Sequence, residues 1–144
     1  MDWKTTALVV IDMENAFISK ESPLCIQEAA KSVPACGRVI RKARERGIPV
    51  FFVNRIYRRN GSDVEFTRYD SWLGGNRYLA PNSTGALSIE VPAEFTPQKG
   101  DYTIIKPRFS AFPDRAGFNS APSGRENCDS DRNNHPELHP YLLL

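Results

Sequence analysis

Two side chains of opposite charge stand where they could do acid–base chemistry. Asp12 lies at the end of the apolar run 6–13, and Lys106 directly follows the apolar run 102–105. A carboxylate beside a lysine ammonium group is either a plain salt bridge or a tuned acid and base, because each charge favours the ionised form of the other. The residue types by themselves leave both interpretations open.

Three short apolar segments predict the strands that would position this pair. They span residues 6–13, 48–54 and 102–105, and none alternates apolar with polar residues. Such runs are typical of strands that are buried on both faces of a parallel sheet. The carboxyl ends of parallel strands lie at one edge of the sheet, where α/β folds place their chemistry. We therefore expect Asp12 and Lys106 at that edge.

A helix is predicted between the first two strands, over residues 32–46. Ser32 is a candidate cap, Gly47 ends the pattern, and one face carries the apolar residues Val39, Ile40 and Ala43. A strand, a helix and a strand in this order join by a right-handed crossover, which gives a parallel pair. The predicted fold class is therefore α/β with a parallel sheet.

Residues 55–98 show no strong periodicity, and only a helical turn is expected, near 62–69. An unstructured stretch of this length is either a functional lid or a sign that elements have been missed. Its first residue, Arg55, could bind a carboxylate or phosphate of a substrate, although arginines in such loops are usually solvated. We name Arg55 as a candidate substrate-binding residue.

The composition changes abruptly after Phe112. All seventeen Val and Ile residues precede that point, whereas residues 113–144 hold neither, and no Lys or Thr, but do hold both histidines. A segment so poor in apolar residues is typical of disorder. We expect a partial domain at 1–112 and a disordered, unrelated tail at 113–144. The change fits an altered reading frame, an alternative exon or a faulty gene model, and a natural flexible tail is the alternative.

Several kinds of partner and site are not expected. The net charge of +2 gives no basis for nucleic-acid binding, and no run is long enough for a membrane span or a signal peptide, so we expect a cytoplasmic protein. Three cysteines without ligand spacing predict neither a disulfide framework nor a zinc site. No histidine precedes His135, which also argues against a Ser–His–Asp triad. We expect no metal and no cofactor.

The sequence segments around Asp12 and Lys106 resemble those of one protein family. The segment ALVVIDMENAF (7–17) is similar to the opening of isochorismatase-like hydrolases, an apolar strand followed by D-x-Q-x-x-F, and IIKPRFSAF (104–112) resembles their K-x-R-x-S-x-F segment. The resemblance implies a three-layer α/β/α fold with strand order 3-2-1-4-5-6 and an Asp–Lys–Cys triad that hydrolyses a small amide. It places Asp12 and Lys106 in the triad and Phe17 in the lining of the substrate pocket.

The chain departs from the family pattern at two points. The family cysteine follows the lysine by about thirty residues, after a helix and a strand, whereas here Cys128 lies among acids in the tail and neither Cys25 nor Cys36 has the required position. Glu14 replaces the usual Gln, and we interpret it as a solvated loop acid; the alternative is a second carboxylate that raises one pKa.

These departures set the functional expectation. We expect family chemistry, C–N hydrolysis of a small-molecule amide, with this chain lacking the nucleophile and inactive. The alternatives are a non-catalytic isoform or pseudoenzyme that binds full-length subunits, since family members commonly form homo-oligomers, and a vinyl-ether hydrolase that uses Asp12 without a cysteine. With half of the sheet missing, the first strand is expected to become an exposed edge in a poorly stable chain.

Overall fold

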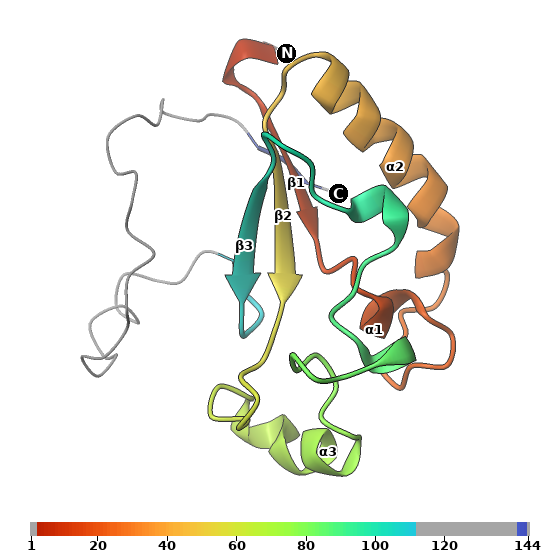
Figure 1. The fold of residues 1–144 in the computed structure, drawn as a ribbon, viewed down its shortest axis with the longest axis vertical. Helices are drawn as coiled ribbons and strands as arrows, with labels where there is room; N and C mark the ends of the chain where they lie inside the picture. Colours follow the sequence, from red (N-terminus) through yellow and green to blue (C-terminus); the bar gives the residue numbers. More distant parts are fainter. Residues whose placement is uncertain (1–2, 112–140, 144) are drawn as a thin grey trace, which may run out of the picture.

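A computed structural model describes residues 3–111 together with the backbone of residues 141–143. Four parallel strands form one sheet in the order β3-β2-β1-β4. The strands are β1 (Ala7–Ile11), β2 (Val50–Arg55), β3 (Tyr102–Lys106) and β4 (Tyr141–Leu143). The labelled strands all run toward the same end of the molecule (Figure 1), so the predicted parallel α/β sheet is confirmed.

The expectation that β1 is an edge strand is wrong for its first three residues. Ala7, Leu8 and Val9 pair in parallel with Tyr141, Leu142 and Leu143 of β4. The composition of the tail gave no reason to expect a strand there, because a single apolar run of this length carries no periodic signal. Residues 113–140 and 144, the rest of the segment that we expect to be disordered, lie outside the described residues.

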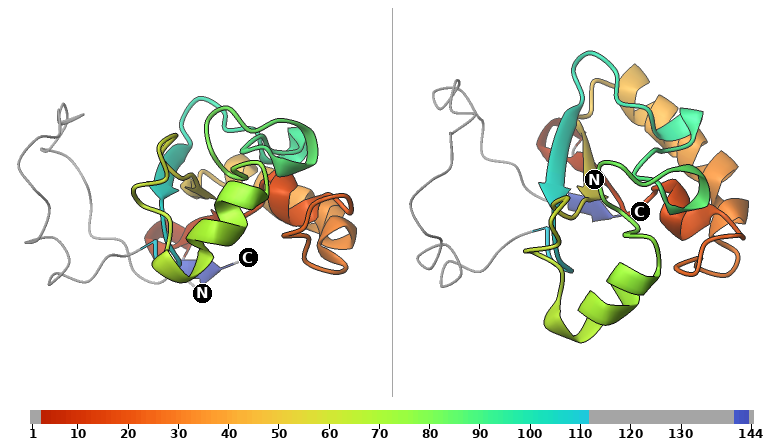
Figure 2. Two further views of the ribbon diagram at one scale, coloured as in Figure 1. Left: turned by 90° about the horizontal axis from the view of Figure 1, so that it is seen from below. Right: turned by 60° about the horizontal axis from the view of Figure 1, so that its bottom comes forward.

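Helix α2 (Ala29–Glu45) covers one face of the sheet (Figures 1 and 2). Its buried residues Ile40 and Ala43 belong to one hydrophobic cluster with residues of β1 and β2, among them Leu8, Val10, Val50 and Phe52. These strand residues alternate with others along each strand, so they point to the same face. The predicted amphipathic helix is therefore present and packs as its apolar stripe requires.

The helix begins three residues earlier than the sequence suggests. Ser32 is not its cap: the Ser32 hydroxyl lies inside the helix and donates to the Ala29 carbonyl at 2.7 Å. Pro34, a residue type that favours the first turn of a helix, is also inside the helix. Alanine is the best helix former, so Ala29 and Ala30 extend the helix toward the amino end even though no side chain caps it.

The stretch between β2 and β3 is folded. The helical turn expected near 62–69 is present at Phe66–Arg68, whereas the other short helices were not predicted. The stretch contains α3 (Tyr69–Gly74) and the 3-10 turns η2 (Phe66–Arg68), η3 (Gly85–Leu87) and η4 (Ala93–Phe95). A second hydrophobic cluster holds it together, formed by Ala16 and Phe17 with Tyr57, Val64, Trp72, Tyr78, Leu79 and Ala80. The segment has its own hydrophobic core. The lack of periodicity in residues 55–98 therefore reflects short elements that were missed in the sequence, and not an unstructured loop.

A glycine is required at one position of this stretch. Gly61 has a φ of +71°, and a Cβ atom there would lie 2.5 Å from a ring carbon of Trp72. The ring is buried and its Nε1 donates to the Tyr78 carbonyl at 2.9 Å, so it is not free to move. Both the backbone angle and the close approach therefore exclude a side chain at this turn.

Two shorter elements complete the described part of the chain. They are η1 (Trp3–Thr5), before β1, and α1 (Asn15–Ile18), directly after it. Within the residues that the structure describes, no helix has the length and apolar character needed to cross a bilayer.

Candidate active site

Asp12 occupies the first position after β1 in a strained backbone conformation. Its φ is +55°, in the left-handed region that non-glycine residues seldom adopt, and its N–H donates to the Val53 carbonyl of β2 at 3.0 Å. This conformation costs an L-residue roughly 1 kcal/mol, somewhat less for Asp, whose short polar side chain tolerates it. The bond to β2 holds the strand end in place, so the turn aims the Asp12 carboxylate across the edge of the sheet.

The structure brings Lys106 to this carboxylate. Its Nζ donates to Asp12 Oδ2 at 2.8 Å and to the Phe109 carbonyl at 3.0 Å. The Lys106 side chain is 5% exposed and that of Asp12 28%. β3 lies beyond β2 in the sheet, so the lysine reaches across the end of β2 to the end of β1. The two ends meet at the carboxyl edge, as the strand assignment predicted.

Three buried polar atoms without a hydrogen-bond partner gather at this edge. Among the described residues, they are Asp12 Oδ1, Glu14 Oε2 and Arg55 Nε. Buried polar side-chain atoms are satisfied in the large majority of cases, so each exception asks for an explanation. Here all three belong to residues at or just after the ends of β1 and β2. Packing alone does not explain three unpaired polar atoms at one edge of the sheet, which makes this edge a candidate functional site.

Glu14 is buried, which contradicts its interpretation as a solvated loop acid. It is 0% exposed, and its Oε1 accepts the backbone N–H of Arg55. Burial raises the pKa of Glu14 to about 7, and the negative charge of Asp12 adds to the shift. The reason is positional: α1 begins directly after Glu14 and packs against the core, which draws the side chain under the strand ends.

Arg55 is also buried, 4% exposed, and not solvated as expected for this loop. Its Nη2 donates to Glu65 and to the Tyr57 hydroxyl, and that hydroxyl donates to Glu65 Oε2 at 2.6 Å. The guanidinium lies 4.8 Å from the ring centre of Phe109. Arg55 is the last residue of β2, so the register of the sheet fixes it inside. Its charge is already paired within the chain.

The same contacts shift the pKa values of Glu65 and Tyr57, the two partners of Arg55. Although burial by itself raises the pKa of Glu65, the hydrogen bond from Tyr57 and the charge of Arg55 lower it below the ordinary value. Burial and the bond to Glu65 raise the pKa of Tyr57. Arg55, Tyr57 and Glu65 therefore form a cation, a neutral phenol and a carboxylate near neutral pH, which we call the Arg55 triplet.

Phe17, the candidate for the pocket lining, lies in α1 and is 9% exposed. It belongs to the second hydrophobic cluster, with Tyr57 and Trp72 among its members. The structure thus gives Phe17 a packing role at the carboxyl edge, and contact with a substrate stays a prediction.

The thiols of the described residues have their contacts elsewhere. Cys25 Sγ lies 3.9 Å from the Ile18 carbonyl oxygen, and Cys36 packs against the cluster between α2 and the sheet, as expected for a small buried hydrophobe. Cys128 lies outside the described residues.

The site also contains two residues that sequence reasoning missed. Phe109 supplies the carbonyl that orients Lys106, and its ring lies between the guanidinium groups of Arg55 and Arg68, 4.8 and 5.1 Å from their carbon atoms. The sequence signal that could have identified Phe109 is its position three residues after Lys106. Glu65 had none, because nothing in the sequence links it to Arg55.

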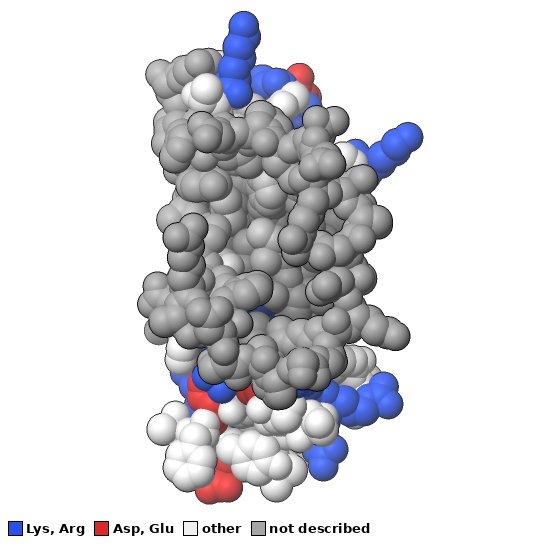
Figure 3. Space-filling model, turned by 90° about the vertical axis from the view of Figure 1, so that its left-hand side faces the viewer, with Lys and Arg blue, Asp and Glu red and all other residues white. Residues whose placement is uncertain are grey.

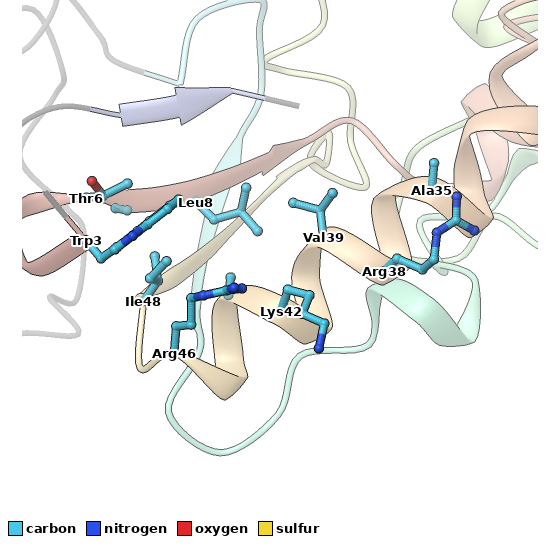
Figure 4. A pocket seen from close by; sticks show the side chains of 11 residues that line it. Trp3, Thr6, Leu8, Ala35, Arg38, Val39, Lys42, Arg46 and Ile48 are labelled. Carbon is cyan, nitrogen blue, oxygen red and sulfur yellow. The ribbon is translucent and has the colours of Figure 1, made fainter. Parts of the chain in front are cut away.

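Charged side chains of both signs appear at the lower end of the molecule, toward which the strands run (Figure 3). A cavity of about 360 Å³ lies in another place, between α2 and the start of β1 (Figure 4). Its floor is apolar; α2 contributes Arg38 and Lys42 to it, and Arg46 follows directly after the helix. Because it adjoins the amino end of β1, it is not the site of Asp12 and Lys106. Of the described residues, no group of three or more His, Cys, Asp or Glu is placed to hold a metal ion.

Comparison with known proteins agrees with the geometry. A probable inactive nicotinamidase from Arabidopsis thaliana is 38% identical over 111 residues, 76% of this chain and 56% of that protein. A ureidoacrylate amidohydrolase from Caulobacter segnis is 32% identical over 132 residues, 78% and 53% of the two chains. The crystal structure of an isochorismatase family protein from Desulfovibrio vulgaris has a TM-score of 0.67 and 37% identity, covering 75% and 55%.

The chain spans about half the length of the curated relatives that it matches. The model of the isochorismatase domain matches residues 6–119, which include both strand ends of the site. The chain therefore belongs to the isochorismatase family.

Proposed function

We propose that Asp12 and Lys106 are two members of an Asp–Lys–Cys triad for C–N hydrolysis of a small amide. The observation that carries the proposal is the 2.8 Å contact between Lys106 Nζ and Asp12 Oδ2 at the carboxyl edge of the sheet. A lysine ammonium group there keeps the Asp12 carboxylate ionised and lowers the pKa of a neighbouring thiol. Asp12 then takes the thiol proton and later gives it to the leaving amine.

The names of the relatives support an amide substrate, because two of them are a nicotinamidase and an amidohydrolase. We further propose that this chain does not complete the triad. Cys25 and Cys36 have their contacts in other parts of the fold, and Cys128 follows Lys106 by 22 residues where the family pattern has about thirty. Phe17 is the proposed pocket residue, while Arg55, already paired, would shape the site without binding the substrate directly.

The test joins residues 1–112 to a family-like ending that carries the cysteine, and assays nicotinamide and ureidoacrylate beside the chain as given. We expect ammonia release by the extended protein only, and its loss in Asp12→Asn. Hydrolysis by the 144-residue chain would refute the second proposal. An extended protein that folds and binds either amide without cleaving it would refute the first.

One observation favours a non-catalytic role as the second candidate. The Arabidopsis relative, 38% identical, is itself described as probably inactive. In that case the chain would bind full-length family subunits, and it should co-purify with them when both are expressed together. A vinyl-ether hydrolase that uses Asp12 without a thiol is tested in the same assays by adding isochorismate as a substrate.

A further inference from the structure

Glu14 is the one acidic residue that is buried among the described residues. It follows β1 and precedes α1, two residues after Asp12, and none of its surface is exposed. A buried carboxylate needs a cation or several donors to remain ionised, because burial removes the water that would solvate the charge.

The two oxygens of Glu14 have different surroundings. Oε1 accepts the backbone N–H of Arg55, whereas Oε2 is buried and has no partner. An ionised carboxylate offers acceptors at both oxygens, but a protonated one is an acceptor at one oxygen and a donor at the other. Oε2 has no donor beside it, so a negative charge on this buried carboxylate would be uncompensated at that oxygen, which favours the protonated, uncharged group. The uncharged group also matches the amide of glutamine, the residue that the resembling motif has at this position.

The nearby cations are committed to other acids. Lys106 donates to Asp12 and to the Phe109 carbonyl, and the Arg55 guanidinium pairs with Glu65. On the adjoining elements, the side chain of Glu90 is exposed, and Lys31 at the start of α2 pairs with Glu28 at the surface. Two charges still act on Glu14: the carboxylate of Asp12, of the same sign, raises its pKa, and the ammonium group of Lys106, already bonded to Asp12, lowers it by a smaller amount.

We propose that Glu14 keeps a proton on Oε2 and acts as a positioning residue, so that Asp12 is the single carboxylate facing Lys106. Burial raises the pKa of Glu14 to about 7, in agreement with this assignment. Below that pH the edge carries one negative charge and one positive charge. Above it, a second carboxylate competes for Lys106 and weakens its contact with Asp12. The inference rests on the proposed function only in taking Asp12 and Lys106 as the reacting pair.

The test is a carbon-detected NMR titration of the uniformly labelled 144-residue chain from about pH 4 to about pH 9, with the Glu14 signal assigned by its loss in Glu14→Gln. We expect the Glu14 carboxyl carbon to titrate with a midpoint near 7 and the Arg55 backbone amide to move with it. The Asp12 carboxyl carbon should show a second inflection at the same pH, which a merely structural Glu14 would not produce. In Glu14→Gln that inflection should vanish while the Arg55 amide stays bonded.

Glu45→Gln is the matched control, since Glu45 is an exposed acid of α2 whose loss should leave both signals unchanged. A Glu14 midpoint near the ordinary 4.5, or an Asp12 profile that Glu14→Gln does not alter, would overturn the inference. If Glu14→Gln does not fold, the Arg55 amide of the unaltered chain still decides, because it must move near pH 7. No substrate is used, so failure of the hydrolysis assay leaves this result standing, and the reverse also holds.

Discussion

Asp12 and Glu14 are both carboxyl groups at the end of β1, yet their surroundings differ. Asp12 has a lysine at 2.8 Å and keeps 28% of its side chain exposed, while Glu14 forms no salt bridge among the described residues and has no exposed surface. Burial raises the pKa of Glu14 to about 7, so this acid can hold a proton at a pH where carboxyl groups in water are ionised. The two carboxyl groups therefore differ because of their burial, and not because of their residue type.

The first prediction concerns the pH dependence of stability. The pKa of Glu14 is about 7 in the folded chain against 4.5 in the unfolded one, so the folded state binds the proton more tightly. The stability that this group contributes is complete below pH 4.5, falls as the pH rises, and is lost above 7, by roughly 3 kcal/mol. Glu14→Gln should remove this fall.

The measurement is urea unfolding of both proteins at about pH 5 and about pH 8, with Glu45→Gln as the exposed control. The unaltered chain and Glu45→Gln should lose equal stability between the two conditions, and Glu14→Gln less. Parallel losses in all three proteins would show that Glu14 is ionised throughout.

The second prediction concerns the ion pair itself. Lys106→Met keeps the length of the side chain but leaves the Asp12 carboxylate without its cation and the Phe109 carbonyl without its donor. We expect a loss of about 2 kcal/mol in the free energy of unfolding, below the usual 3–5 for a fully buried pair because Asp12 is partly exposed. The double variant with Asp12→Asn should recover part of that loss in denaturant melts; additive losses would mean that the pair does not interact.

The sequence led to the position of this pair but not to its neighbours. Asp12 and Lys106 end apolar runs, so strand assignment alone places them at one edge. Glu14 and Arg55 were expected in solvent, because polar residues in loops usually are. Glu14 is buried because α1 follows it and packs against the cluster formed by residues 57–80, and Arg55 because it pairs with Tyr57 and Glu65; the helix of that segment is too short to show a period.

At the scale of elements, the Arg55 triplet joins the end of β2 to the segment before η2. Arg55 and Tyr57 belong to the strand and its extension, and Glu65 precedes the 3-10 turn. Phe109, packed over Arg55, brings in the chain after β3. Three segments that are distant in sequence thus meet on one guanidinium group, and they hold the loops that frame Asp12 and Lys106.

The third prediction tests this junction. Glu65→Ala leaves the guanidinium of Arg55 buried without its carboxylate, and removing one partner of a buried pair costs about 3–5 kcal/mol. Glu45→Ala breaks the exposed pair with Lys42 in α2 and should leave the free energy of unfolding nearly unchanged. Both free energies come from urea unfolding. Similar small losses in the two variants would mean that the triplet does not stabilise the fold.

Element prediction succeeded where the apolar pattern was strong and failed where it was interrupted. The three strands were found because their short runs are uniformly apolar, and the helix between the first two because it has an apolar stripe. The start of α2 was misplaced, since Ser32 and Pro34 are typical of a helix start and outweighed Ala29 in the pattern. β4 was missed because its partner, β1, is more than a hundred residues away in the chain.

At the scale of the whole molecule, β4 changes the expectation for the open side of the sheet. It pairs with Ala7, Leu8 and Val9, so that part of β1 is an inner strand, whereas no described strand pairs with Val10 and Ile11 on this side. The order β3-β2-β1-β4 agrees with the first four positions of the order that the resemblance implies, 3-2-1-4-5-6. An unpaired length of strand exposes backbone N–H and C=O groups to other chains.

The last prediction follows from that pairing. Replacing residues 141–144 by Gly-Ser-Gly-Ser keeps the length of the chain but removes the apolar residues of β4, and glycine disfavours a strand. The edge at Ala7, Leu8 and Val9 should then open, with faster amide exchange at these residues and self-association in light scattering after size exclusion, because an open hydrophobic edge recruits another strand. Exchange at Phe51 and Phe52 of β2, which pair on both sides, serves as the internal control. If exchange in β1 is unchanged and the protein remains monomeric, β4 does not protect this edge in solution, and the first strand is the exposed edge that the composition of the tail suggested.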